Sequence, residues 1–479
     1  MQEPGVLSID QGSGSTKALV LNSIGEIVAR STLEIKTSFP QPGWVQQNPE
    51  KIWESVVKTA SDVISQCRDF KIVGIGLSTQ RESLVVWSRS TGKSLSPVLT
   101  WQDRSSAPLL PSFAGSKDLI RTISGLPLDP MFTALKATQV LAEITSDLAD
   151  ICIGTIDSWL LWNLGAGHVI ESGNASRTQL MDVKIGKWSS ELLEIFSINS
   201  RVLPEIIDSN AVLGIKAGVI PGIAADTPVS GVMGDSHAAL FAHAGWLPGR
   251  VKATYGTGSS IMTLGKPRNS STGLCTTIAW SLNGIQSLAL EANILSSGST
   301  LVWLANLLGD TVENLMQSAS SSHEIVQIIP AFNGLAAPWW DDNAVGLISG
   351  VSLGTTRADI ASAGMDSIAM QVSDVLDEIR LAGVNINSLR VDGGPTRNAE
   401  LLQRQSDFGN ILVEVPDVQE LSAIGAGNLA GLTVGLWTIQ DLETRARIQQ
   451  SFIPQMDHAE RNERRNAWKN AVARARMRI

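Results

Sequence analysis

Short polar clusters that follow apolar runs carry the side chains with the clearest chemical potential in this chain. Arg81 and Glu82 come directly after the run KIVGIGLSTQ (71–80). Ligands of α/β proteins bind at the carboxyl ends of strands, so this pair of opposite charges could hold polar groups of a substrate. A surface ion pair is the alternative interpretation. In TWQDR (100–104), Trp101 could pack against the C–H face of a polyol, although simple core packing explains it equally well.

A carboxylate at the end of another apolar run is the best candidate for a general base. The segment VSGVMGDSHAALFAHAG (229–245) passes from a predicted strand through Asp235 into a predicted helix. An Asp in this position most often serves only as the helix N-cap. Asp235 also stands shortly before a glycine turn around Gly256, and a hydroxyl that attacks a γ-phosphate needs a carboxylate within hydrogen-bonding reach. We therefore predict that Asp235 takes the proton of a hydroxyl nucleophile.

Glycine segments offer places where phosphates could approach the backbone. IDQGSGST around Gly12 is echoed by ATYGTGSS around Gly256, each an apolar entry, a Gly-x-Gly turn and an apolar exit. A plain tight turn uses the same residues, but two copies favour phosphate sites, where glycine exposes backbone N–H groups. Asp10 beside the first copy is the kind of ligand that Mg²⁺ usually has. A third segment, RVDGGPTRNAELL (390–402), places Gly394 before a helix start, which suits a nucleotide.

The elements that must position these residues are those of an α/β protein. Apolar runs VLSID (6–10) and ALVLN (18–22) flank the first glycine turn and predict a strand pair. Asn48 and Pro49 then open a predicted helix with apolar residues at helical spacing. Since the strand–glycine–strand pattern returns halfway along the chain, we predict two related α/β domains that face one another across a cleft, with the boundary near 244–250.

Composition narrows the classes of protein that fit. With 479 residues, 43% hydrophobic and 17% charged, the chain is too apolar for intrinsic disorder and long enough for two or three domains. A formal charge of -9 argues against general binding to nucleic acid. The three cysteines, Cys67, Cys152 and Cys275, stand far apart, which predicts neither a zinc site nor a disulfide framework and fits a reducing compartment.

One uncharged stretch raises the question of a membrane. Residues 421–440 carry no charge and include Gly427, Gly431 and Gly435 at the four-residue spacing of packed membrane helices. A helix buried between layers of a soluble protein needs the same small residues, and we favour that interpretation. The first residues, MQEPGVLSIDQG, lack the basic and apolar stretches of a signal peptide, so we expect a cytoplasmic protein with no membrane association.

Taken in order, the motifs of this chain resemble those of the FGGY carbohydrate kinases, and within that family most closely those of glycerol kinases. The resemblance covers about residues 5–440 and rests on these segments: IDQGSGSTKALV, STQRESLVVW, LTWQDR, GLPLDPMF, GTIDSWLLWNL, NASRTQL, GDSHAAL, TYGTGSS, PAFNGLAAPWW, LRVDGGPTRNAELLQRQSD and AIGAGNLAGL.

The resemblance implies two ribonuclease H-like (actin-like ATPase) domains with an interdomain cleft, an N-terminal one over 1–244 and a C-terminal one over 245–479. The first would bind the polyol or sugar and phosphates and carry the base, and the second would bind ATP. Carried over by position, the implied roles are Mg²⁺ binding for Asp10; phosphate binding for Ser13, Gly14 and Lys17; nucleotide binding for Thr257, Gly298, Gly394 and Asn398; and acceptor binding for Arg81, Glu82, Trp101 and Asp235, with Asp235 as the base.

Departures from the glycerol kinase pattern fall in the acceptor pocket. Met131, Ser236 and Ser260 stand where glycerol kinases have Tyr, Gln and Phe. The first change removes a hydroxyl and the other two replace large side chains by small ones. We hypothesise a pocket larger than that of a strict glycerol kinase, lined in part by these three residues. Three further departures are Lys17 for Arg, Val302 for Gln and Gln139 for Trp.

The predicted activity is therefore phosphorylation of a hydroxyl of a small polyol or sugar, dependent on ATP and Mg²⁺ and yielding ADP. The first alternative is a kinase for a larger polyol or a ketose such as erythritol or xylulose. Asp10, Asp235 and both glycine hairpins disfavour a catalytically silent ligand-binding protein, which has no need for a base. A plain ATPase would have no use for the Arg81–Glu82 pair beside Asp235. We expect a small-molecule acceptor as the partner, and the sequence leaves a homo-oligomer open.

Overall fold

The computed structural model describes residues 2–267, 273–322 and 325–478. Contacts within the chain divide it into two compact units. The first comprises 1–244, 276–288 and 420–446, and the second comprises 245–275, 289–419 and 447–479. The predicted domain boundary between 244 and 245 coincides with the point where the chain first passes from one unit to the other. The predicted domain 245–479 differs from the structure, because two of its segments belong to the first unit.

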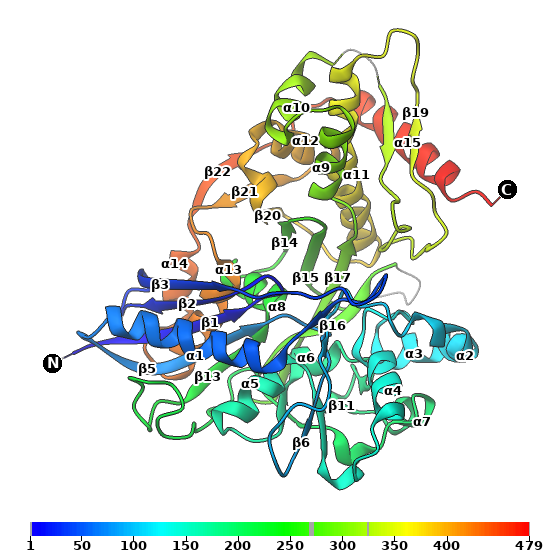
Figure 1. Cartoon of the computed structure of the whole chain (residues 1–479). Coiled ribbons are helices and arrows are strands. Elements are labelled where there is room, and N and C mark those ends of the chain that lie inside the picture. Colours follow the sequence, from blue (N-terminus) through cyan, green and yellow to red (C-terminus); the bar gives the residue numbers. More distant parts are fainter. Residues whose placement is uncertain (1, 268–272, 323–324, 479) are drawn as a thin grey trace. The chain divides into compact units, whose positions relative to one another are not determined.

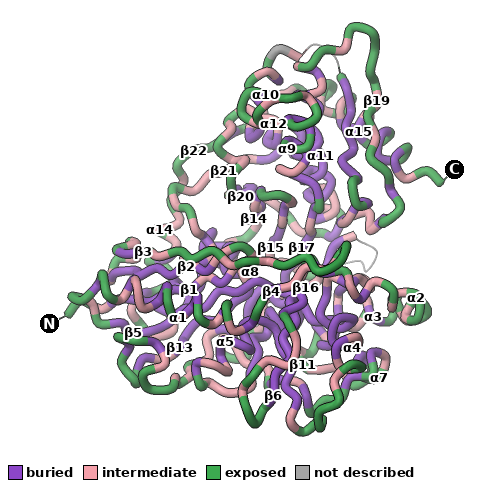
Figure 2. Tube along the Cα trace, viewed as in Figure 1, coloured by how far each residue is buried: buried purple, intermediate pink, exposed green. Residues whose placement is uncertain are grey.

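The sheet of the first unit has the strand order β13-β5-β1-β2-β3 (Figure 1). Neighbouring strands β1, β2 and β3 are antiparallel, whereas β5 and β13 run parallel to β1 and to each other. The bounds are β1 Glu3–Gln11, β2 Ser15–Leu21, β3 Ile27–Glu34, β5 Phe70–Thr79 and β13 Val229–Gly234. The predicted strand pair around the first glycine turn is β1–β2, so that prediction is confirmed. The inner strands of this sheet are buried, as the purple segments of Figure 2 show.

Helix α1 (Pro49–Gln66) covers one face of this sheet. Its N-cap is the predicted Asn48, whose side-chain oxygen accepts from the backbone N–H of Lys51 at 2.8 Å. Apolar residues at helical spacing, among them Ile52, Val56 and Ala60, are fully buried against the strands. The hydrophobic period read from the sequence therefore matches the packed face.

Helices α13 (Leu421–Thr433) and α8 (Asp235–Ala242) pack against each other, and α13 also packs on β1, β5 and β13. Glycines allow this close approach: a Cβ at Gly76 would collide with the carbonyl oxygen of Ala426, and one at Gly425 with that of Ala238. This packing explains why 420–446 belongs to the first unit. It also confirms the buried-helix interpretation of the small-residue stretch. Within the described residues, the structure has no helix long and apolar enough to span a bilayer.

Segment 276–288 belongs to the first unit through hydrogen bonds of its own. The hydroxyls of Thr277 and Ser176 lie 2.6 Å apart, and Ser281 Oγ donates to Asp208 Oδ1 at 2.5 Å. The remaining elements of the first unit are β4 Gln46–Gln47, β6 Val85–Ser88, β7 Val98–Leu99, α2 Leu110–Phe113, α3 Lys117–Ser124, α4 Thr133–Glu143, β8 Ile151–Gly154, α5 Ile156–Leu164, β9 Val169–Glu171, α6 Ser172–Ser176, β10 Met181–Asp182, β11 Lys187–Trp188, α7 Ser190–Ile195, β12 Glu205–Ile207 and α14 Ile439–Arg445.

The strands of the second unit follow the order β17-β15-β14-β20-β21-β22. Within it, β17, β15 and β14 are antiparallel neighbours, and β20 and β21 continue parallel to β14. The order β17-β15-β14-β20-β21 therefore repeats β3-β2-β1-β5-β13 of the first unit in position and direction. The expected pair of related α/β units is confirmed by this topology.

Strand β16 (Cys275–Leu282) lies almost entirely in segment 276–288 of the first unit, and β17 (Ile285–Ile294) begins there. The other elements of the second unit are β14 Arg250–Tyr255, β15 Ser259–Leu264, α9 Gly298–Leu307, α10 Val312–Ser318, β18 Gln327–Ile329, β19 Leu347–Ser349, α11 Arg357–Leu381, β20 Ser388–Asp392, α12 Ala399–Gly409, β21 Leu412–Pro416, β22 Ile448–Phe452 and α15 His458–Ala475.

Candidate active site

The turn after β5 buries its two charged residues and holds the second of them, Glu82, in a strained backbone conformation. Arg81 and Glu82 are both about 5% exposed or less, and Glu82 has a φ of 60°, in the left-handed region. Arg177 Nε donates to Glu82 Oε1 at 2.6 Å, while Thr133 Oγ1 and Lys136 Nζ donate to the Glu82 carbonyl at 3.1 and 3.3 Å. Such conformations cost free energy and persist where surrounding contacts fix them, as at many functional sites. The surface ion pair interpretation of Arg81 and Glu82 is wrong.

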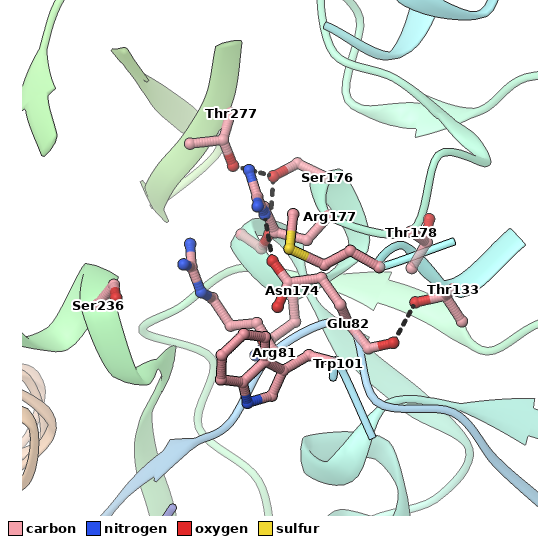
Figure 3. A network of polar contacts seen from close by, with 12 residues as sticks. Arg81, Glu82, Trp101, Thr133, Asn174, Ser176, Arg177, Thr178, Ser236 and Thr277 are labelled. Carbon is pink, nitrogen blue, oxygen red and sulfur yellow. Dashed lines mark hydrogen bonds and ion pairs between the residues drawn. The ribbon is translucent and has the colours of Figure 1, made fainter. Parts of the chain in front are cut away.

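Arg81 faces the start of α8 rather than its neighbour Glu82. Its Nε lies 3.4 Å from Asp235 Oδ1, and its Nη1 lies 3.3 Å from His237 Nε2. Figure 3 shows the guanidinium turned toward the α8 turn that carries Ser236. The sequence-predicted residues Arg81, Asp235 and Ser236 are thus brought together.

Asp235 is the first residue of α8, and Gly234 is the N-cap. Its Oδ1 accepts from the backbone N–H of Ser236 at 2.6 Å, and its side chain is 36% exposed. The simple N-cap interpretation therefore does not describe this carboxylate. An accessible carboxylate beside a guanidinium can accept a proton from an incoming hydroxyl.

Asp10 lies at the end of β1, half-buried, and accepts from Ser78 Oγ at 2.8 Å. Burial raises the pKa of Asp10 to about 6. Ser78 and Lys17 oppose this rise in the pKa, while the carboxylates of Asp235 and Glu420 add to it. Negative charge accumulated in a buried place is stabilised by a cation, and oxygen is the ligand atom that Mg²⁺ prefers.

A magnesium ion needs few ligands from a kinase. The described residues contain no group of three or more His, Cys, Asp or Glu able to hold a metal. Mg²⁺ in phosphoryl-transfer sites is bound by one or two carboxylates together with phosphate oxygens and water. The single carboxylate of Asp10 fits that donor set.

The first glycine hairpin connects Asp10 to Trp101. Its tip closes through a bond from Gly12 N–H to Ser15 O at 2.9 Å, and Lys17 lies directly opposite Asp10 in the register of β1 and β2. Trp101 Nε1 donates to Ser13 Oγ at 2.8 Å. Gly14 is exposed, with open space where a Cβ would stand. The hairpin and its hydrogen bonds therefore place Ser13, Gly14, Lys17, Asp10 and Trp101 in one part of the first unit.

The second unit brings its three glycine segments together. Gly298 N–H donates to Gly256 O at 2.9 Å, which joins the start of α9 to the second hairpin. A Cβ at Gly393, whose φ is 101°, would collide with the carbonyl oxygen of Tyr255. Exposed Thr257 and Gly394 lie on these joined segments, and Asn398 caps α12 by accepting from Leu401 N–H at 2.8 Å. The predicted nucleotide residues thus occupy one place in this unit.

The residues that depart from the glycerol kinase pattern lie in both units. Met131 is half-buried ahead of α4, and its carbonyl accepts from Lys136 Nζ at 2.6 Å. Ser260 lies on β15 in the second unit, 3.4 Å from Lys252 Nζ. Val302 on α9 is 51% exposed.

Sequence reasoning missed the buried residues that support the acceptor group. Arg177 is fully buried and also stacks over Phe132 at 5.0 Å, and Lys136 is fully buried beneath Glu82 and Met131. Burial lowers the pKa of Lys136 to about 7, against the opposing charge of nearby carboxylates including that of Glu82. A lysine flanked by apolar residues on a helix, as Lys136 is by Leu135 and Ala137, is the signal that could have revealed this support.

Comparison with known proteins adds independent information. Models of the FGGY family of carbohydrate kinases match residues 5–242 (N-terminal domain) and 251–434 (C-terminal domain). The chain is 38% identical to apulose kinase of Pectobacterium atrosepticum, covering 100% of this chain and 99% of that protein. It is 37% identical to glycerol kinase 2 of Thermotoga maritima, covering 98% of each. Plasmodium falciparum glycerol kinase, solved with ADP, superposes with a TM-score of 0.94 at 31% identity over 100% and 99% of the two chains.

Proposed function

This chain belongs to the FGGY family of carbohydrate kinases, enzymes that transfer phosphate from ATP to a hydroxyl of a sugar or polyol, and we propose that Asp235 is its general base. The observation that supports this role is the contact of 3.4 Å between Arg81 Nε and Asp235 Oδ1, beside the strained Glu82 turn. The family relationship and this arrangement of charges support the same assignment.

The residues of the first unit would bind and orient the acceptor. The Arg81 guanidinium donates to one hydroxyl oxygen, and the Glu82 carboxylate accepts from a neighbouring hydroxyl, so together they select a vicinal pair. Trp101 supplies an apolar face. The reacting hydroxyl gives its proton to Asp235 as its oxygen bonds to the γ-phosphorus, and the bond to the leaving ADP breaks.

Asp10 would hold Mg²⁺, which when bound neutralises charge on the β- and γ-phosphates. Ser13, Gly14 and Lys17 would contact phosphate oxygens through hydroxyl, backbone and ammonium groups. Thr257, Gly298, Gly394 and Asn398 would line the nucleotide in the second unit. Their place on joined glycine segments, where backbone is exposed, supports this assignment.

The acceptor we propose is larger than glycerol, a polyol or sugar of four to six carbons. Sequence identity to known relatives does not discriminate between acceptors, because a relative named apulose kinase and one named glycerol kinase match almost equally, at 38% and 37%. Met131, Ser236 and Ser260 support the larger acceptor, since each replaces a glycerol kinase side chain by one that is smaller or lacks its polar group.

A coupled assay of ADP release over polyols and ketoses of three to six carbons tests the proposal. We expect kcat/KM for one of the larger acceptors to exceed that for glycerol by at least about tenfold, since one carbon in a pocket is worth 10- to 200-fold. Asp235→Asn should abolish acceptor-dependent turnover. Met131→Tyr, which restores the glycerol kinase residue, should shift the preference toward glycerol.

Each part of the proposal has its own contrary outcome. Highest kcat/KM with glycerol would overturn the larger acceptor while leaving the base intact. Acceptor-dependent turnover that survives in Asp235→Asn would overturn the base assignment. If none of the compounds in the panel is phosphorylated, the proposed acceptor class is overturned.

A further inference from the structure

The imidazole of His237 lies next to the proposed base and touches the guanidinium that faces it. His237 is fully buried on the first turn of α8, two residues after Asp235. Its Nε2 lies 3.3 Å from Arg81 Nη1. Arg81 is thus held by two residues of one helical turn, Asp235 at Nε and His237 at Nη1.

The chemistry of this contact defines the state of the ring. Arginine carries only donors, so Nε2 of His237 must accept, and the imidazole is neutral with its proton on Nδ1. A neutral acceptor can fix the direction of a guanidinium without cancelling its charge.

The backbone makes room for this ring. A Cβ at Gly173 would lie 2.9 Å from His237 Nδ1, and a Cβ at Gly234 would lie 3.1 Å from Nδ1 and 2.5 Å from Arg81 Cδ. Contacts under 3.0 Å are too close for carbon, so any side chain at these glycines would displace the imidazole or the arginine. Two glycines from α6 and from the end of β13 therefore hold a space for the Arg81–His237 pair.

The distance between Arg81 and the proposed base links His237 to catalysis. Charge-assisted hydrogen bonds between guanidinium and carboxylate groups are typically about 2.7–2.9 Å long. The Arg81–Asp235 contact is longer, at 3.4 Å. A guanidinium free to rotate would close onto the carboxylate and occupy the oxygen that must accept the substrate proton.

We propose that His237 is a positioning residue for the acceptor site, which keeps Arg81 directed at the substrate hydroxyl and away from a closed ion pair with Asp235. The inference rests on the proposed function, because it assumes that Arg81 binds the acceptor and Asp235 takes its proton. His237 itself contacts neither substrate nor nucleotide in this role. It acts through Arg81.

Steady-state kinetics of His237→Leu and His237→Gln test this role, with the preferred acceptor and ATP varied separately. Loss of one hydrogen bond to a charged group corresponds to roughly 10- to 100-fold. We expect His237→Leu to lower kcat/KM for the acceptor by that factor, with KM for ATP unchanged. His237→Gln, which keeps an acceptor atom, should recover most of the loss. His243→Leu, a buried histidine at the end of the same helix, is the matched control and should leave acceptor KM unchanged.

A double-mutant cycle with Arg81→Ala separates positioning from general support of the fold. If His237 acts through Arg81, His237→Leu should have no further effect on kcat/KM in the Arg81→Ala background. Equal effects of His237→Leu in both backgrounds would overturn the inference, as would wild-type acceptor kinetics of His237→Leu. Failure of the proposed function looks different, because Arg81→Ala and Asp235→Asn would then retain acceptor-dependent turnover.

Discussion

The two glycine hairpins share a topology but differ in the groups that surround them. Each lies between antiparallel strands of a sheet with the same order and directions, β3-β2-β1-β5-β13 in one unit and β17-β15-β14-β20-β21 in the other. Two residues before the first glycine, the first hairpin has Asp10 and the second has Thr254. The two units therefore share the hairpin topology, but only the first has a carboxylate at this position.

The surroundings sharpen this difference. The first hairpin contacts side chains that carry charge or polar groups, through the Ser13–Trp101 bond and the Asp10–Ser78 bond. The second hairpin contacts backbone through the bond from Gly298 N–H to Gly256 O and the tight approach of Gly393 to Tyr255, together with an uncharged bond between the hydroxyls of Ser259 and Ser297 at 2.8 Å. We infer that the first unit contributes charged side chains to the reaction, whereas the second contributes exposed backbone suited to a nucleotide.

The largest expected effect comes from exchanging the carboxylate. Asp10→Asn should lower kcat by about 10²- to 10³-fold, because a neutral amide would hold the charge-stabilising Mg²⁺ less well than the carboxylate does. Thr254→Val, the matched change in the second hairpin, should lower it by less than about threefold. Initial rates over a range of Mg²⁺ concentrations measure both. Comparable losses in the two variants would show that the hairpins contribute in the same way.

A second prediction compares the effects on stability of two glycines, one in the first hairpin and one that packs against the second. Gly393→Ala should destabilise the protein by about 2–4 kcal/mol, because its φ of 101° is strained for alanine and the Cβ would collide with Tyr255 O. Gly14→Ala should change stability by less than about 0.5 kcal/mol, since nothing lies within 4 Å of its Cβ. Urea-induced unfolding at fixed pH compares the two. A large loss in Gly14→Ala would contradict the open surface described for the first hairpin.

Local patterns in the sequence predict the strands, the hairpins and α1 well, because each depends on neighbours along the chain. The position of α13 does not follow from such patterns. It depends on glycines far apart in sequence, such as Gly76 and Gly425, that let helices and strands approach closely. The assignment of 420–446 to the first unit could be established only from these contacts.

The candidate site shows the same limit. Arg81 and Asp235 follow apolar strands, so their place at a strand end could be predicted. The left-handed conformation of Glu82 and its support by Arg177 and Lys136 could not, because those partners come from separate helical and turn segments. Charged residues that are exposed and those that are buried beneath a site look alike in sequence until the fold pairs them.

The smallest of the three effects concerns one such hidden partner, Lys136. Its ammonium bridges the carbonyls of Glu82 and Met131, at 3.3 and 2.6 Å, and so joins two segments proposed to bind the acceptor. Lys136→Met should raise acceptor KM about tenfold through loss of these hydrogen bonds and leave KM for ATP unchanged. Thr138→Val on the same helix, whose hydroxyl bonds to Ala134 O and Phe196 O, is the control. An equal rise in both KM values in Lys136→Met would indicate general distortion of the site.

Stability as a function of pH gives Lys136→Met a second, independent readout. Burial lowers the pKa of Lys136 from its ordinary 10.5 to about 7 in the folded protein. Between these values the unfolded chain binds more protons than the folded one, so this lysine makes stability rise as pH increases from about 7 toward 10.5. The free energy of unfolding of Lys136→Met, measured in urea across pH 7 to 10, should therefore rise less steeply than that of the wild type. Parallel curves would contradict the lowered pKa of Lys136 in the folded protein.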